Sequence, residues 1–238
     1  GGSTATPGTG AAAATATGLA SGSAGVPVAC ASTAGFHSVG VAPRGGGLTF
    51  TAARAVSGAY GVDVFQQSEG RTVLPQRLVA RFGAKATEHF SWAGTDRAGR
   101  RVRDGYYVVR FRVKSGAETD VRRIALRRSG GRFTIRPDFY GRAGCTVIRS
   151  AKLSGPTFGG SNRRPLGIAF QLAGAGHATV TAATGGKTVL TRKVTAAARR
   201  TQRLALPARG TRPGDYVVTI TATTAGRTQT ARLTARRL

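Results

Sequence analysis

The chain has 238 residues and a formal net charge of +27, with 36 lysine and arginine residues against 9 acidic ones. So few carboxylates leave little material for acid–base catalysis or a calcium site, and no run of apolar residues is long enough to span a membrane. Hydrophobic residues make up 40% of the chain, close to the usual globular level, so most of its length can bury a core.

The first 29 residues consist almost entirely of Gly, Ala, Ser and Thr. Nothing in residues 1–29 can bury a large side chain, so we expect a segment that is flexible when it stands alone. Residues Gly8 to Ala13 fit the dinucleotide-binding pattern G-x-G-x-x-A, but no predicted strand precedes them and no acidic residue follows at the required distance. A nucleotide site is therefore rejected, and no cofactor is predicted.

The two cysteines, Cys30 and Cys145, stand at the edges of the first predicted domain. Their separation fits neither a zinc site nor a redox pair. A disulfide between them would close a long loop and contribute about 4–5 kcal/mol in the chain-entropy model. Two buried free thiols, which suit a reducing compartment, are the competing interpretation. We favour the disulfide because a covalent link is useful at a domain edge.

Residues 36–145 contain about seven segments in which apolar and polar residues alternate, the pattern of half-buried strands. The clearest unit runs from Phe90 to Val113, where Asp104-Gly105 is a turn signal before an alternating strand. One face of that strand is predicted to line a core. It carries Tyr107, Val109, Phe111 and Val113, with Tyr106, Val108, Arg110 and Arg112 on the other face.

The second half repeats this design, with Gly, Thr and Pro turns between short strands. The predicted strands are 146–153, 168–172, 178–183, 188–194, 202–206, 216–222 and 228–238. The segment from Gly105 to Val113 aligns with the segment from Gly214 to Ala222 at a spacing of 109 residues. Such a period equals one sandwich domain. The sequence therefore predicts an all-β chain of two tandem β-sandwiches, at 30–146 and 147–238, behind the low-complexity segment 1–29.

The stretch from Trp92 to Tyr107 reads WAGTDRAGRRVRDGYY. It resembles the immunoglobulin-like domain of flagellar hook-capping proteins, also found in secreted bacterial proteins, whose pattern is approximately W-D-G-x-D-x-x-G-x-x-V-x-x-G-x-Y. The matching positions are Trp92, Gly94, Asp96, Gly99, Val102, Gly105 and Tyr107, with Gly214 and Tyr216 repeating the end of the pattern in the second half. The resemblance lies mainly in residues 90–113 and departs from the pattern at Ala93. It implies two immunoglobulin-like sandwiches and carries no catalytic residue.

The chemistry of Trp92 and Asp96 by itself also predicts structural roles for these two residues. Trp92 is expected to fill the sandwich core. Asp96 suits a tight turn, with its side chain accepting a hydrogen bond from the backbone two residues on.

No catalytic or metal site is predicted. The three histidines are isolated along the chain, at His37, His89 and His177. Neither a metal-binding spacing nor a G-x-S-x-G nucleophile elbow occurs. Glu118 and Asp120 share one face of a predicted hairpin, but the adjacent Arg122 and Arg123 favour a local salt-bridge cluster. We therefore expect a protein that is not an enzyme.

Arginine doublets are spread along both halves of the chain. The residues singled out as possible polyanion contacts are Arg122, Arg123, Arg127, Arg128, Arg163, Arg164, Arg199, Arg200, Arg236 and Arg237. Two interpretations stay open: solvated strand faces of a secreted protein, or contact with an anionic polysaccharide or wall polymer. A recognition helix or an aromatic stacking platform is missing from the predicted elements, so sequence-specific nucleic-acid binding is not expected.

Two functions fit these observations. The first is a non-catalytic extracellular structural protein, a surface, filament or matrix subunit that assembles through β-strand edges with residues 1–29 as a donor strand. Its partners would be further copies of itself or neighbouring surface proteins. The alternative is a polyanion-binding or cell-wall-binding adhesion module of a larger secreted protein. Both place the chain outside a bacterial cell, after removal of a signal peptide.

Overall fold

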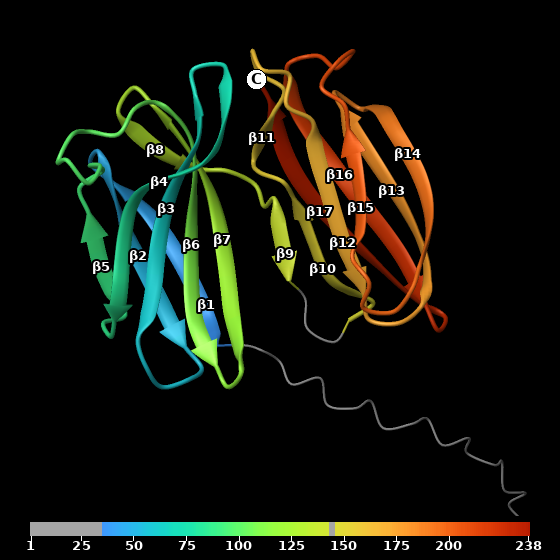
Figure 1. Cartoon of the computed structure of the whole chain (residues 1–238), viewed down its shortest axis with the longest axis horizontal. Coiled ribbons are helices and arrows are strands. Elements are labelled where there is room, and N and C mark those ends of the chain that lie inside the picture. The colour runs from blue at the N-terminus through green and yellow to red at the C-terminus, as the bar shows by residue number, and fades with distance from the viewer. Residues whose placement is uncertain (1–34, 143–145) are drawn as a thin grey trace, which may run out of the picture. The chain divides into compact units, whose positions relative to one another are not determined.

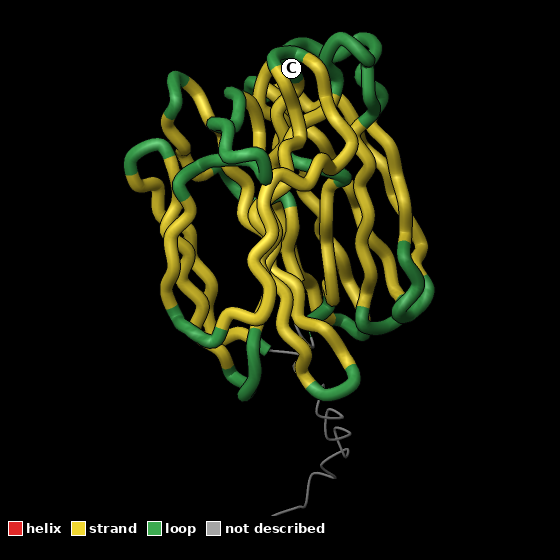
Figure 2. The backbone as a smooth tube through the Cα atoms, turned by 60° about the vertical axis from the view of Figure 1, so that its left-hand side comes forward, coloured by secondary structure: helices red, strands yellow, loops and turns green. Residues whose placement is uncertain are grey.

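The computed structural model describes residues 35–142 and 146–238, and every regular element in those ranges is a strand (Figures 1 and 2). The all-β prediction is thus confirmed. The segment 1–29 and the predicted disulfide partners Cys30 and Cys145 lie outside the described residues, so the disulfide stays a prediction. No helix in the described ranges has the length and apolar character needed to cross a membrane.

The first sandwich is built from eight strands. They are β1 (Phe36–Arg44), β2 (Gly47–Arg54), β3 (Tyr60–Glu69), β4 (Thr72–Lys85), β5 (His89–Trp92), β6 (Gly105–Ser115), β7 (Glu118–Ser129) and β8 (Arg132–Ile135). One sheet has the order β1-β2-β5 and the other β4-β3-β6-β7-β8. Phe50 from the smaller sheet and Phe111 from the larger one are both fully buried in the shared core.

The second sandwich follows the same plan. Its strands are β9 (Tyr140–Arg142), β10 (Ile148–Leu153), β11 (Thr157–Phe158), β12 (Leu166–Leu172), β13 (Gly176–Thr184), β14 (Lys187–Ala196), β15 (Gln202–Leu206), β16 (Gly214–Thr224) and β17 (Arg227–Arg237). The sheet orders are β15-β12-β10-β9 and β11-β17-β16-β13-β14. Strand β9 pairs with β10, so residues 140–142 belong to this sheet although they precede the predicted boundary at 146/147.

The two sandwiches share most of their strand order and the register of one strand pair. Gly105 lies opposite Arg128 in the β6–β7 pair, and Gly214 lies opposite Arg237 in the β16–β17 pair. Both pairs therefore keep the 109-residue spacing that the sequence repeat showed. The two sandwiches differ at two edges: β8 runs antiparallel to β7 whereas β11 runs parallel to β17, and β9 has no counterpart in the first sandwich.

Each repeat begins with the same corner. The hydroxyl of Tyr107 donates a hydrogen bond to the carbonyl of Arg103, and that of Tyr216 donates to the carbonyl of Arg212 at 3.0 Å. This is the tyrosine corner of immunoglobulin-like sandwiches. Gly105 opens its strand at a φ of 151°, and a Cβ there would lie 2.2 Å from the carbonyl oxygen of Ser68. Only glycine fits that close approach.

The core of the first sandwich follows the predicted alternation along β6. Tyr107, Val109 and Phe111 are all fully buried and belong to one cluster. The opposite face of β6 is also covered at one end, because Val108 is only 1% exposed. It packs with Phe139 in the core cluster of the second sandwich.

The chain passes from β8 to β9 through four residues, 136–139. The backbone N–H of Arg136 donates to Ala125 of β7 at 2.8 Å. The carbonyl of Asp138 accepts from the Thr234 N–H at 2.7 Å, and that of Phe139 accepts from the Leu153 N–H at 2.8 Å. The connection is therefore bonded to both sandwiches along its length.

Candidate functional site

The connection between β5 and β6, residues 93–104, is held at its base by Trp92. The indole is 7% exposed and lies 5.9 Å from the ring of Phe133. Its N–H donates a hydrogen bond to the carbonyl of Thr95 at 2.9 Å, which satisfies the polar group of a buried aromatic side chain. The loop thus begins from a fixed point in the core.

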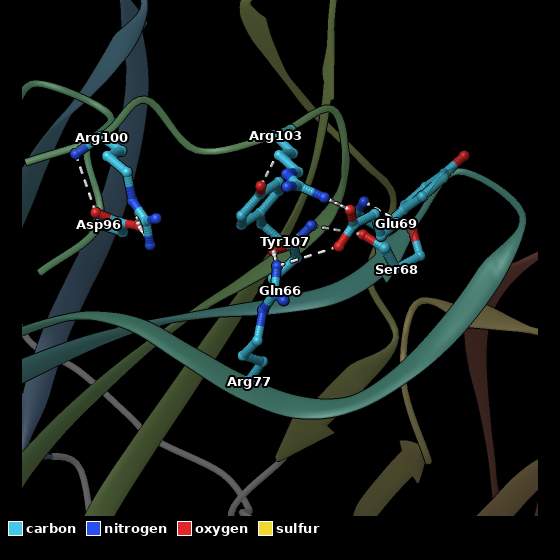
Figure 3. Close-up of polar contacts among 9 residues, drawn as sticks. Gln66, Ser68, Glu69, Arg77, Asp96, Arg100, Arg103 and Tyr107 are labelled. Carbon is cyan, nitrogen blue, oxygen red and sulfur yellow. Dashed lines mark hydrogen bonds and ion pairs between the residues drawn. The ribbon is translucent and has the colours of Figure 1, made fainter. Parts of the chain in front are cut away.

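A tight turn in this loop is organised by Asp96. One carboxylate oxygen accepts hydrogen bonds from the backbone N–H of Ala98 at 2.9 Å and of Arg100 at 3.0 Å. The other oxygen contacts the Arg100 guanidinium at 3.1 Å (Figure 3). The hydrogen bond from the Arg100 backbone has the largest effect on the pKa of Asp96 and lowers it. Burial, the next largest effect, opposes it, and the Ala98 N–H and the Arg100 guanidinium lower the pKa further.

The remaining motif residues close the loop onto the sheet. Gly94 has a φ of 78°, and a Cβ there would lie 2.1 Å from the carbonyl oxygen of Gly46. The N–H of Gly99 donates to the carbonyl of Asp96 at 3.0 Å. Val102, 5% exposed, donates its N–H to the carbonyl of Gly94 at 3.0 Å. These contacts fix the path of the loop and leave its arginine side chains pointing away from the core.

A cavity of about 460 Å³, hereafter the loop cavity, lies between this loop and β4. Its basic lining consists of Arg77, Arg97, Arg100, Arg101 and Arg103. Asp96 is the single acidic residue of that lining. The cavity is therefore strongly positive.

Two of these arginines are positioned by the end of β3. The guanidinium of Arg77 donates to the side-chain oxygen of Gln66, whose amide donates to the carbonyl of Ser68 at 2.9 Å (Figure 3). Glu69 pairs with Arg77 at 3.4 Å and also with Arg103. The hydrogen bond from Arg103 is the main cause that lowers the pKa of Glu69. Glu69 thus stays ionised and holds both cations at the rim of the cavity.

The loop cavity keeps hydrogen-bonding capacity for a ligand. The side chains of Arg100 and Arg103 are 79% and 73% exposed, so their ion pairs are screened by solvent and weak. Arg101 donates to the carbonyl of Ala93 at 3.2 Å, and Arg97 is exposed. Each guanidinium carries five N–H donors, which leaves several free for an anion.

A second charged cluster lies on the outer face of the larger sheet of the first sandwich. The carboxylate of Asp63 has no exposed side-chain surface and contacts three guanidinium groups, those of Arg81 at 2.8 Å, Arg110 at 2.8 Å and Arg112 at 3.0 Å. Burial raises the pKa of Asp63, but hydrogen bonds from Arg110 and Arg81 and the charge of Arg112 outweigh it, so the net pKa is lowered. A carboxylate held ionised in this way suits a structural role better than proton transfer.

Of the salt-bridge cluster predicted at β7, the structure shows the ion pair between Asp120 and Arg122. The buried carboxylate of Asp120 contacts the Arg122 guanidinium at 3.1 Å and also accepts the backbone N–H of Phe36 at 3.2 Å. Arg123 does not join the pair. It stacks over the ring of Tyr140 at 4.6 Å, and burial lowers its pKa.

The other predicted doublets separate into two groups. Arg163-Arg164 and Arg199-Arg200 occupy exposed turns, where Arg163 and Arg199 have positive φ angles of 48° and 57°. The second group lines one cavity of about 450 Å³. It consists of Arg127, Arg128, Arg236 and Arg237.

The arginines of the loop cavity are absent from the predicted contacts. A signal existed, because residues 97–103 hold four arginines in seven positions, the sequence RAGRRVR. The family pattern uses only Gly99 and Val102 of this stretch and gives its arginines no role. Arg77 could not have been added from local sequence, because only the β3–β4 pairing brings it to the loop.

The residues that the structure describes contain no group of three or more His, Cys, Asp or Glu side chains placed to hold a metal ion. The carboxyl groups of Asp63, Glu69 and Asp96, whose pKa values are lowered, are each surrounded by arginine or by backbone N–H groups. What the loop cavity offers is a set of fixed donors for negative charge.

No family model and no curated protein matches the chain. Among solved structures, it is similar to the chicken CNTN1 FN1-FN3 domains, with 13% identity and a TM-score of 0.27 over 84% of this chain and 65% of that one. It is also similar to the BSP domain of a biofilm associated protein, with 14% identity and a TM-score of 0.25 over 79% of this chain and 27% of that one. The chain spans less than two thirds of each of these two structures.

Proposed function

We propose that the chain is a non-catalytic, extracellular binding module that holds an anionic polymer, an acidic polysaccharide or a wall polymer, through the loop cavity. The observation that carries this proposal is the lining of that cavity, where five arginines face one acidic residue. The resemblance to an immunoglobulin-like domain of secreted bacterial proteins supports the extracellular setting. Polymers with carboxylate, phosphate or sulfate groups all present oxygen pairs that match the guanidinium fork.

The physics of binding follows from the net charge. A chain at +27 attracts a polyanion at long range, and arginines at the cavity fix the position of the polymer. Each neutralised charge releases a condensed counterion, so affinity should fall steeply as salt rises. The cavity volume, about 460 Å³, lies in the range of small-molecule pockets and accommodates a short segment of a polymer.

A filament built by strand-edge pairing has less support. Two strands at sheet edges carry rows of cations, Arg77, Arg81 and Lys85 on β4 and Lys187, Arg192 and Lys193 on β14. Charged side chains on edge strands are a common protection against edge-to-edge pairing. The proposed donor segment, residues 1–29, lies outside the described residues, so edge assembly stays a prediction.

The test is calorimetric titration of the full chain with heparin and with long-chain polyphosphate between 50 and 500 mM NaCl. We expect affinity to fall linearly with the logarithm of salt concentration. The variant Arg97→Gln/Arg101→Gln should bind at least tenfold more weakly and show a salt slope smaller by about 2, one for each lost contact.

The matched control is Lys187→Gln/Lys193→Gln, which removes the same charge from exposed positions on β14. An equal loss in this control would show general attraction to net charge and would overturn the loop cavity as the site. No binding of either polymer at 50 mM NaCl would overturn the proposed function.

A further inference from the structure

The second cavity, hereafter the junction cavity, takes its lining from both sandwiches. It has a volume of about 450 Å³. Its basic residues are Arg71, Arg127 and Arg128 from the first sandwich and Arg236 and Arg237 from the second. Asp104 is the single acidic side chain in the lining. Two sets of like charges therefore face one space.

The acidic groups near this cavity are already engaged. Asp104 contacts Arg128 at 2.9 Å and accepts the backbone N–H of Gly130 at 2.7 Å. That backbone hydrogen bond is the main cause that lowers the pKa of Asp104. Asp215 contacts Arg236 at 3.3 Å but is shared with Arg136 at 3.0 Å. The cavity keeps an excess of positive charge after these pairs are counted.

One buried donor in the lining has no partner. The side chain of Arg128 is 9% exposed, and its Nε has no hydrogen-bond partner in the described structure. Buried N–H groups are nearly always bonded, and an orphaned one calls for an explanation such as an absent ligand. Arg71 and Arg127, in the same lining, both have exposed side chains. The guanidinium groups thus offer donors that the protein itself does not satisfy.

The junction cavity is already formed by contacts between the sandwiches. The N–H of Ser161 donates to the carbonyl of Arg71 at 2.9 Å, and the Asn162 amide donates to the carbonyl of Val73 at 2.7 Å. The hydroxyl groups of Thr72 and Ser161 lie 2.8 Å apart. These bonds fix the backbone at Arg71 against the second sandwich, so a ligand would meet a preorganised site.

We infer that the junction cavity is a second anion site, which takes phosphate groups and couples the two sandwiches. A phosphate accepts several N–H donors at once and matches the geometry of guanidinium groups. By lying between arginines of both sandwiches, it replaces their mutual repulsion with attraction to a shared anion. The inference rests on the proposed function in that one phosphate-bearing polymer fills both cavities.

Tripolyphosphate is a suitable probe because it is short and highly charged. The experiment titrates it into the ¹⁵N-labelled full chain and follows two reporters by NMR. The indole N–H of Trp92, the one tryptophan, reports on the loop cavity through its bond to Thr95. The amide N–H groups of Gly105 and Gly130 report on the junction cavity, since Gly105 lines it and Gly130 bonds to Asp104.

Three double variants separate the two sites. Arg71→Gln/Arg127→Gln should weaken binding at the junction reporters at least tenfold and leave the response of Trp92 intact. Arg97→Gln/Arg101→Gln should do the reverse, and Lys187→Gln/Lys193→Gln should change neither response by more than twofold. In buffer of low salt, the junction variant should also melt at a higher temperature than the natural chain, because two repelling charges are gone.

The outcomes distinguish the two proposals. Shifts at Trp92 without shifts at the junction reporters would overturn the junction site and leave the proposed function standing. Shifts at neither site would overturn both. An equal loss at the junction reporters in the β14 control would show that net charge alone drives binding, and it would overturn the junction site as well.

Discussion

The two sandwiches keep the same register in the β6–β7 and β16–β17 pairs and differ on the outer face of the larger sheet. In the first sandwich one row across that face is charged, and in register order it reads Arg81, Asp63, Arg110 and Arg123. The corresponding row of the second reads Thr191, Thr181, Thr219 and Arg232. A carboxylate with its guanidinium partners is thus replaced by hydroxyl groups on an equivalent backbone.

The threonine face has interactions of its own. The hydroxyl groups of Thr223 and Thr228 lie 2.8 Å apart, and those of Thr221 and Thr230 lie 3.1 Å apart. Such cross-strand pairs stabilise a sheet without buried charge. The two sandwiches thus keep equivalent strand pairs although the outward-facing side chains on those strands differ in chemistry.

A second difference lies before the tyrosine corners. The first sandwich connects β5 to β6 through residues 93–104, and the second connects β15 to β16 through the shorter segment 207–213. The longer connection provides the Asp96 turn and four arginines of the loop cavity. The loop cavity thus belongs to one copy of the repeat because of the length of one loop.

The largest expected effect comes from truncating Trp92 and Leu206, which occupy equivalent core positions in the two sandwiches. Trp92 pairs with Leu48 across the smaller sheet, as Leu206 pairs with Leu166 in the second sandwich. Trp92→Ala should lower the free energy of unfolding by about 3–5 kcal/mol, and Leu206→Ala by about 2–5 kcal/mol. Urea unfolding followed by circular dichroism measures both. A cost below about 1 kcal/mol for Trp92→Ala would contradict its place in the core.

The next prediction compares how much the charged row and the threonine row contribute to the free energy of unfolding. Asp63→Asn removes the carboxylate that three arginines share, and we expect a loss of about 1–2 kcal/mol after allowance for the partial exposure of those arginines. The control is Thr181→Ser at the equivalent position, expected to lie within about 0.5 kcal/mol of the natural chain. Equal costs in the two variants would mean that the charged row contributes nothing particular to stability.

The tyrosine corners should give a smaller effect of similar size in both copies. Tyr107→Phe loses one hydrogen bond and should cost about 1 kcal/mol. Tyr216→Phe should cost slightly more, because its oxygen also accepts the N–H of Arg212 at 3.1 Å. The same denaturation assay applies, and no change in either variant would refute a stabilising corner.

Alkaline pH adds a reporter for the first corner. Burial raises the pKa of Tyr107 to about 12, against smaller opposing effects of Arg128 and Arg77. A pKa raised by folding means that stabilisation is complete below pH 10 and is lost as pH rises through 12. Unfolding midpoints of the natural chain should therefore fall over this range, and by less in Tyr107→Phe.

The smallest expected effect is a difference in acid stability between the two sandwiches. The carboxyl groups with lowered pKa values, Asp63, Glu69, Asp96 and Asp104, all lie in the first sandwich. Their stabilisation is present above the unfolded values, 3.8 for Asp and 4.5 for Glu, and is lost as pH falls toward the folded values. Hydrogen exchange with mass spectrometry should show the first sandwich loosening before the second below about pH 4. Simultaneous loosening would contradict this order.

Much of the fold could be predicted because the alternation of apolar and polar residues along a strand indicates which side chains face the core. The predicted strand 202–206 matches β15, and the repeat at Gly105 and Gly214 matches the starts of β6 and β16. The burial of Val108 could not be predicted, because alternation within one sandwich says nothing of a neighbour that covers its outer face. The candidate cavities were missed for a related reason: they depend on which distant arginines meet across sheets and across the junction.

The four-residue connection between β8 and β9 has a mechanical consequence. Pro137 fixes one backbone angle, while Arg136, Asp138 and Phe139 are all bonded to strands of the sandwiches. A pull along the chain would therefore have to break these hydrogen bonds before the connection could lengthen. Tension along the chain would pass from β8 through these bonded residues into β9 and its neighbour β10.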